Sequence, residues 1–143
     1  MVNYYIFYLF GGITVLAKKR AFISFDYDHD LDLKNLLVGQ SKHSDTPFDI
    51  ADYSIKDVSY DWKEKARARM VRCDVAIIIC GEYTHTASGV SVELKIAQEL
   101  RLPYFLLSGR SGKNCSKPYA AYDSDLVYTW TWDNLKKLLN GQR

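Results

Sequence analysis

A glutamate on the apolar face of a helix is the first residue of this sequence whose type and position suggest chemistry. A helical period over residues 88–100 places one set of side chains on an apolar face (Val90, Leu94, Ala97 and Leu100). Glu93 lies in the middle of this face, one turn into the helix. Burying a carboxylate is costly unless it is paired or lies in a solvated cleft. Glu93 is therefore either a structural carboxylate, paired with Arg72, Lys95 or its own helix terminus, or an active-site acid that faces a pocket.

The segments around Glu93 predict how it is positioned. Residues 75–80 (VAIIIC) form an apolar run without alternation, which is typical of a strand covered on both faces in a parallel sheet. Gly81 ends this strand, and the polar loop 82–88 leads to Ser88-Gly89, which we expect to cap the helix of Glu93. The loop and the start of the helix therefore follow the carboxyl end of a buried strand.

The rest of the chain repeats this pattern of strand and helix. We expect strands at residues 20–25, 48–52, 104–107 and 127–130, and helices at residues 31–38, 60–71 and 132–139. Asp30 is the expected cap of the first helix, and Ser59 or Asp61 that of the second. The alternation predicts an α/β fold with a flavodoxin-like, doubly wound, parallel sheet of five strands in the order 2-1-3-4-5. The loops 26–30 and 81–88 would then flank a crevice at one edge of the sheet.

Composition and charge narrow the class of protein. The 143 residues, 48% of them hydrophobic, suit one domain with a proper core. A formal net charge of +2 is too small to indicate nucleic-acid binding. The 3 cysteines form no CxxC pair and favour a reduced, cytoplasmic protein, and the 3 histidines have no metal-ligand spacing, so we expect no metal site. The sequence contains neither a G-x-G-x-x-G motif nor a Walker loop.

The N-terminal residues 1–18 differ from the rest of the chain. Residues 1–17 carry no charge and are followed by Lys18-Lys19-Arg20. As a membrane helix this stretch is short and is interrupted by Gly11-Gly12, and it lacks the basic start of a secretory signal. We expect an apolar extension that is dispensable or associates with a membrane, followed by one domain at residues 19–143.

Several segments together resemble the Toll/interleukin-1 receptor (TIR) domains, and more narrowly the microbial TIR-like proteins of Thoeris anti-phage defence. The matching segments are residues 20–25 with the following acidic turn, 73–79, 88–97, 103–109 and 130–132. The resemblance covers residues 19–139. One departure is that Gly89-Val90 stands where many TIR domains have a Trp-Cys pair, which leaves the wall of the pocket and the details of the substrate open.

The resemblance implies an activity and a site. Enzymatic TIR domains cleave the nicotinamide–ribose bond of NAD, with a catalytic glutamate at the position of Glu93. Thoeris-type members make a nucleotide signal from the ADP-ribose for a downstream effector, and TIR domains also self-associate. NAD is then the substrate and no further cofactor is implied. Phe25 and Tyr27 would stack on nicotinamide or adenine, Ser24, Asp26 and Asp28 would bind ribose hydroxyls, and His85 and Ser88 lie in the loop beside Glu93. For each residue other than Glu93, ordinary packing or turn formation is the alternative role.

Rival functions come from other classes of protein. A phosphoacceptor receiver domain shares the fold and an acidic turn, but it needs an aspartate where this chain has Cys80-Gly81. A nucleoside deoxyribosyltransferase also uses a carboxylate on a glycosidic bond. A TIR adaptor would only assemble with other TIR domains, and it would have no need of an embedded Glu93.

Overall fold

The parallel sheet forms as the alternation predicts. The computed structural model describes residues 4–9, 11–56 and 59–143. Five strands form one sheet: β3 (Lys19–Ser24), β4 (Phe48–Tyr53), β5 (Val75–Cys80), β6 (Tyr104–Ser108) and β7 (Val127–Thr129). All neighbours in it run parallel, in the spatial order β4-β3-β5-β6-β7. This is the expected order 2-1-3-4-5, so the flavodoxin-like arrangement is confirmed.

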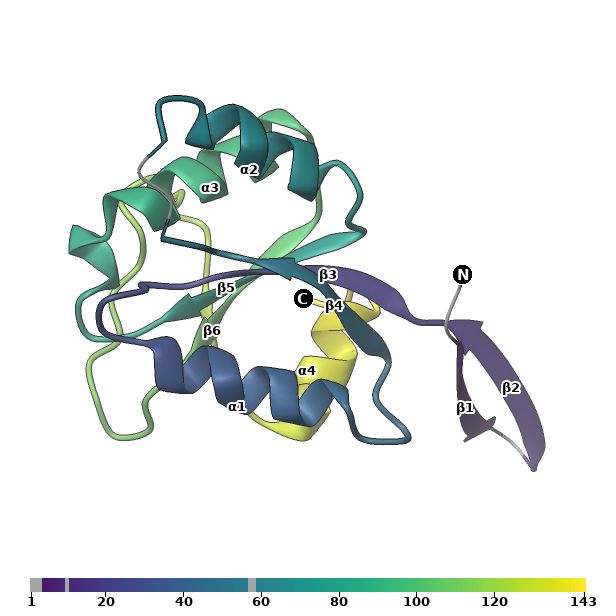
Figure 1. Cartoon of the computed structure of the whole chain (residues 1–143). Helices are drawn as coiled ribbons and strands as arrows, with labels where there is room; N and C mark the ends of the chain where they lie inside the picture. Colours follow the sequence, from purple (N-terminus) through teal and green to yellow (C-terminus); the bar gives the residue numbers. More distant parts are fainter. Residues whose placement is uncertain (1–3, 10, 57–58) are drawn as a thin grey trace.

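The described residues form four α-helices, which cover the two faces of the sheet (Figure 1). α2 (Trp62–Met70) and α3 (Ser88–Glu99) lie on one face, and α1 (Leu31–Ser41) and α4 (Trp132–Leu139) lie on the other. Side chains of β3 alternate between the two layers, with Phe22 in the α2–α3 core and Ile23 in the α1–α4 core. Every residue of β5 is buried, as the unbroken apolar run predicts.

Helix starts differ from the sequence expectations. α2 begins at Trp62 rather than residue 60, and α3 begins at Ser88 with Ala87 at the N-cap position. Asp30 and Asp61 occupy N-cap positions, but neither side chain accepts a capping hydrogen bond. Asp30 binds Arg110 instead, and Asp61 lies 3.3 Å from the Lys65 amine. These carboxylates have charged partners that a local capping pattern does not reveal.

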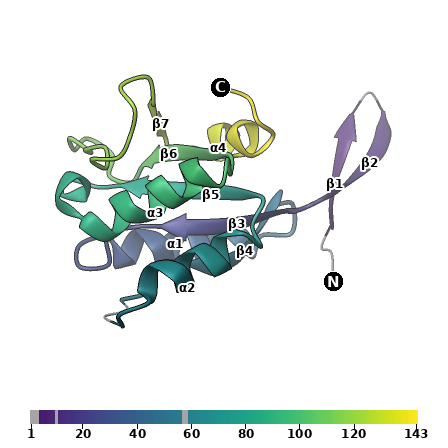
Figure 2. The same ribbon diagram turned by 90° about the horizontal axis from the view of Figure 1, so that it is seen from above.

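The described residues of the N-terminal segment form a β-hairpin rather than a helix, and the expectation that this extension is dispensable or associates with a membrane stays a prediction. β1 (Tyr4–Leu9) pairs antiparallel with β2 (Gly12–Ala17), and Gly11 supplies the positive φ of 76° at the turn. Aromatic and β-branched residues favour strands, which explains this outcome. No helix in the described part of the chain is long and apolar enough to cross a membrane. Both views show the hairpin projecting away from the five-stranded sheet (Figures 1 and 2).

An ionic clamp joins two loops at the carboxyl edge of the sheet. Arg110, in the connection between β6 and β7, donates to Asp30 Oδ1 at 2.9 Å and to both carboxylate oxygens of Asp32 at 2.9 and 3.0 Å. Asp30 is 1% exposed, and its burial raises its pKa against the lowering effect of Arg110. Gly81 leaves room for this carboxylate, because a Cβ there would lie 2.3 Å from Asp30 Oδ2. The clamp fixes the loop that follows β3.

All three cysteines are free thiols. Burial raises the pKa of Cys73 to about 11 and that of Cys80 to about 12. Cys115 is half-buried, and its thiol donates to the backbone oxygen of Arg110 at 3.6 Å. Cys80 is therefore a packing residue of the central strand, as its apolar surroundings in the sequence predict.

Candidate active site

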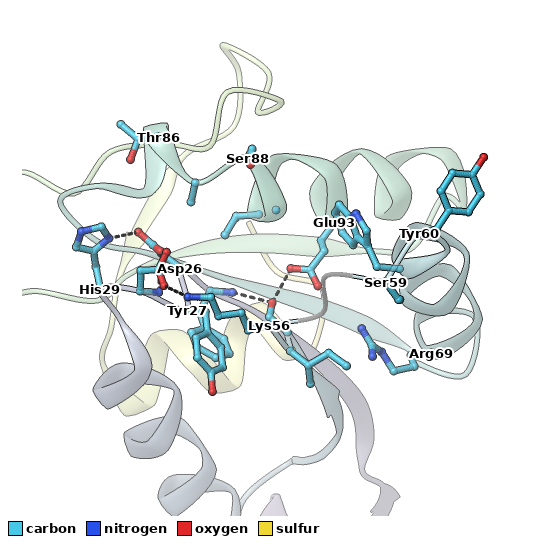
Figure 3. A pocket seen from close by; sticks show the side chains of 18 residues that line it. Asp26, Tyr27, His29, Lys56, Ser59, Tyr60, Arg69, Thr86, Ser88 and Glu93 are labelled. Atoms are coloured by element: carbon cyan, nitrogen blue, oxygen red, sulfur yellow. Dashed lines mark hydrogen bonds and ion pairs between the residues drawn. The ribbon is translucent and has the colours of Figure 1, made fainter.

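A pocket of about 620 Å³ opens at the carboxyl edge of the sheet. Its walls come from the turn after β3, the loop after β4, the α2 helix and the start of α3, and Figure 3 shows the side chains that line it. Ligands of open α/β sheets bind at this edge, and pockets for small molecules have volumes of about 300–1,000 Å³. The position and size of the pocket both suit a small organic ligand.

Glu93 lines this pocket, as its position on the helix predicts. The side chain is 5% exposed, and its Oε1 accepts hydrogen bonds from Ser24 Oγ at 2.9 Å and from Ser54 Oγ at 2.5 Å. Both of these bonds end on the same oxygen, so Oε2 is the atom available to a ligand. Among the described residues no cation lies within ion-pair distance of Glu93, which argues against the buried ion pair with Arg72 or Lys95.

The surroundings of Glu93 change its proton affinity. Burial raises the pKa of Glu93 from 4.5 to about 7, although the hydrogen bonds from Ser54 and Ser24 and the charge of Arg69 act in the opposite direction. A carboxyl group with such a pKa exchanges its proton close to neutral pH. Strongly perturbed carboxyl groups in pockets are typical of functional sites.

Ser24 and Ser54 position the carboxylate from two neighbouring strands. Ser24 is the last residue of β3 and is fully buried, so it contacts Glu93 rather than lining the pocket. Ser54 directly follows β4, and its hydroxyl also accepts a bond from the Phe25 backbone amide at 3.2 Å. Ser54 is not among the site residues expected from the sequence. Its position just after a strand was a usable signal, because the ends of parallel strands meet at one edge.

The turn after β3 supplies the other wall of the pocket. Phe25, Asp26, Tyr27 and Asp28 all line it, and the rings of Phe25 and Tyr27 are stacked with centroids 5.9 Å apart. Asp26 is nearly buried, and its Oδ2 lies 2.7 Å from Nδ1 of His29. The structure therefore brings the residues of the acidic turn to the same pocket as Glu93 (Figure 3).

The two candidates from the loop before α3 have different positions. Ser88 lines the pocket, and it is the first residue of α3. His85 does not line it, since this residue lies in a short 3-10 helix (Thr84–Thr86) and its Nδ1 is 2.8 Å from Ser116 Oγ. His85 thus holds the β6–β7 connection, and the structure gives no support for its expected contact with substrate.

Sequence reasoning also missed the basic residues of the pocket. Lys56 and Arg69 line it from the β4–α2 loop and from α2. Lys56 donates to Asp28 Oδ1 at 2.8 Å, whereas the positive charge of Arg69 lowers the pKa of Glu93. In the sequence Arg69 is one of several basic residues on a charged helix, and nothing local distinguishes it from its neighbours.

The described residues include no group of three or more histidine, cysteine, aspartate and glutamate side chains placed to hold a metal ion. No protein-family model matches this chain, and no curated protein matches it either.

Proposed function

We propose that this protein is a TIR-like enzyme that cleaves the bond between nicotinamide and ribose in NAD. One observation carries the proposal. Glu93 lies in the wall of a ligand-sized pocket, held on one oxygen by two serines and without a cationic partner among the described residues. A buried carboxylate without a cation lowers the stability of the folded protein, and carboxylates retained for function commonly have this cost.

The chemistry requires few groups. Nicotinamide leaves as a neutral molecule and needs no general acid, while the ribose left behind develops oxocarbenium character. In this proposal Glu93 Oε2 orients the ribose hydroxyls and stabilises the positive charge that develops on the sugar. Ser24 and Ser54 both donate to Oε1, which leaves Oε2 as the oxygen that can contact the ligand. The ionised form of Glu93 is the active one.

The aromatic turn provides a surface for the bases of the dinucleotide. Tyr27 is exposed in the pocket wall, where nicotinamide or adenine can pack against its ring, whereas Phe25 is 2% exposed and supports Tyr27 from the core. Asp26 and Asp28 line the same wall and can accept hydrogen bonds from ribose hydroxyls. The product would be a nucleotide derived from ADP-ribose that signals to a separate effector in anti-phage defence, and the enzyme would work by self-association through TIR surfaces.

The test is an assay of nicotinamide release from NAD by the purified wild-type protein and the Glu93→Gln variant. We expect release by the wild type and its loss in the variant, with thermal melts showing that the variant is folded. Because a Thoeris-type enzyme is triggered by infection, the same pair is compared by nucleotide profiling of cells under phage challenge.

Three outcomes contradict the proposal. A Glu93→Gln variant that still releases nicotinamide removes the catalytic role of this carboxylate. Turnover of deoxynucleosides, with no NAD-derived product from the protein or from infected cells, favours the deoxyribosyltransferase alternative. Absence of both activities favours the adaptor.

A further inference from the structure

Arg69 is a cation in the pocket wall, and none of the described residues accepts a hydrogen bond from its Nε atom. It lines the pocket from α2, and its side chain is 20% exposed. Its Nε atom is buried and has no hydrogen-bond partner in the described part of the chain. The carboxylate of Asp52 lies 3.8 Å from this atom, which is beyond hydrogen-bond distance. More than about nine in ten buried polar groups in proteins have a partner, so an unsatisfied guanidinium nitrogen needs an explanation.

Other basic residues nearby are paired. Lys56, also in the pocket wall, donates to Asp28. Arg67, two residues before Arg69 on the same helix, donates to Glu99 outside the pocket. Arg69 alone of these three combines a position in the pocket with an unsatisfied donor. In Figure 3 its side chain reaches from α2 to the side of the pocket on which Glu93 lies.

We propose that Arg69 is the binding residue for a phosphate group of the ligand, and that the pocket takes a nucleotide whose diphosphate lies beside α2. The choice of a phosphate over a carboxylate rests on the proposed function. A guanidinium group presents a planar fork of donors that binds two oxygens of a phosphate at once. Because Nε itself is buried, an anionic ligand would bind the exposed part of the guanidinium group, and it would compete with Asp52 for this cation.

The geometry divides the pocket between the parts of such a ligand. Glu93 faces the sugar that is cleaved, and Arg69 lies on the same side of the pocket, so the diphosphate that follows this sugar would be held next to it. The stacked rings of Phe25 and Tyr27 lie in the wall formed by the turn after β3. Arg69 would thus contribute mainly to substrate affinity, while Glu93 contributes to the chemical step.

The experiment compares the binding of ADP and adenosine, which differ only in the diphosphate. Trp62 lines the pocket, so titration followed by tryptophan fluorescence or by calorimetry reports occupancy without any turnover. For the wild type we expect ADP to bind at least about tenfold more tightly than adenosine, because a hydrogen-bonded charge contributes about this much. Arg69→Gln should remove most of the difference and leave adenosine binding unchanged.

The matched control is Arg67→Gln, which removes the same charge from the same helix outside the pocket and should bind both compounds like the wild type. Arg69→Lys keeps the charge without the fork, and we expect its affinity for ADP to lie between those of the wild type and Arg69→Gln. Thermal melts show whether each variant is folded.

Because the experiment measures binding and not turnover, its result decides this inference independently of the proposed NAD-cleaving activity. A wild type that does not prefer ADP to adenosine overturns the inference, and so does an Arg69→Gln variant that keeps the preference, even if the protein cleaves NAD. Conversely, an Arg69-dependent preference for ADP supports the inference even if nicotinamide is never released. If Arg67→Gln loses the preference as well, the effect is one of overall charge, and the inference is wrong.

Discussion

At the scale of single residues, the environment of Glu93 connects stability with pH. The pKa of this carboxyl group is about 7 in the folded protein and close to 4.5 in an unfolded chain. Between these two pH values the folded state binds more protons than the unfolded state. Stability from this group is therefore fully present below pH 4.5 and is lost as the pH rises through about 7.

This linkage predicts how Glu93→Gln changes stability. The wild type loses stability as the pH rises, because its buried carboxyl group ionises, whereas the neutral variant does not. The free energy of unfolding of the variant minus that of the wild type should therefore increase by up to about 3 kcal/mol from pH 5 to pH 8. Denaturant titrations at both pH values measure the difference. Glu99→Gln, an exposed position on the same helix, is the control and should show a pH-dependent change below about 1 kcal/mol. A difference independent of pH would mean that Glu93 does not titrate in this range.

The hydrogen bond from Ser54 leads to a second prediction. Ser54→Ala removes a donor that stabilises ionised Glu93, so the pKa of Glu93 should rise further above 7. Carbon-13 NMR titration of the glutamate carboxyl group measures this shift directly, and an activity profile should move to higher pH with it. Ser88→Ala is the control, because Ser88 lines the pocket without a described bond to Glu93. A pKa that falls or stays constant in Ser54→Ala would contradict the assigned role.

At the scale of elements, the clamp between Arg110 and Asp30 holds the β3–α1 turn against the β6–β7 connection. Arg110→Ala leaves the buried Asp30 carboxylate without its cation, and we expect a loss of roughly 2–4 kcal/mol in the free energy of unfolding. Asp32→Ala removes only an exposed partner of the same arginine and should cost less than about 1 kcal/mol. Urea unfolding of both variants tests the prediction. Equal losses would show that the clamp is a surface ion pair.

The same elements show how far the sequence predicts the structure. Periodicity was sufficient for the buried β5 strand, the order of the sheet and the pocket position of Glu93, because burial on one face or on both faces leaves a pattern within a single segment. Ser54 and Arg69 reach the pocket from other segments, so no local pattern connects them with Glu93. For the same reason Asp30 was expected to cap a helix, whereas its partner is Arg110, far along the chain.

At the scale of the whole molecule, the N-terminal hairpin and the five-stranded sheet are two separate β-sheets. Within the part of the chain that the structure describes, β1 pairs only with β2, and neither strand belongs to the five-stranded sheet. We expect deletion of residues 1–17 to leave a folded protein whose melting temperature lies within a few degrees of that of the full chain. Calorimetry of both forms measures this, with Arg110→Ala as the reference for a destabilised protein. Loss of a cooperative transition would mean that the hairpin is part of the folding unit.

The burial of two of the three thiols also makes the protein suitable for attachment of a single reporter. Maleimides react with thiolates, and at neutral pH Cys73 and Cys80 are almost entirely protonated and out of reach. Cys115 is left as the labelling site in the native protein, without any cysteine having to be removed. It directly precedes Ser116, which binds the loop between β5 and α3 through His85. A fluorophore on Cys115 would therefore report movements of the loop that leads to the candidate active site.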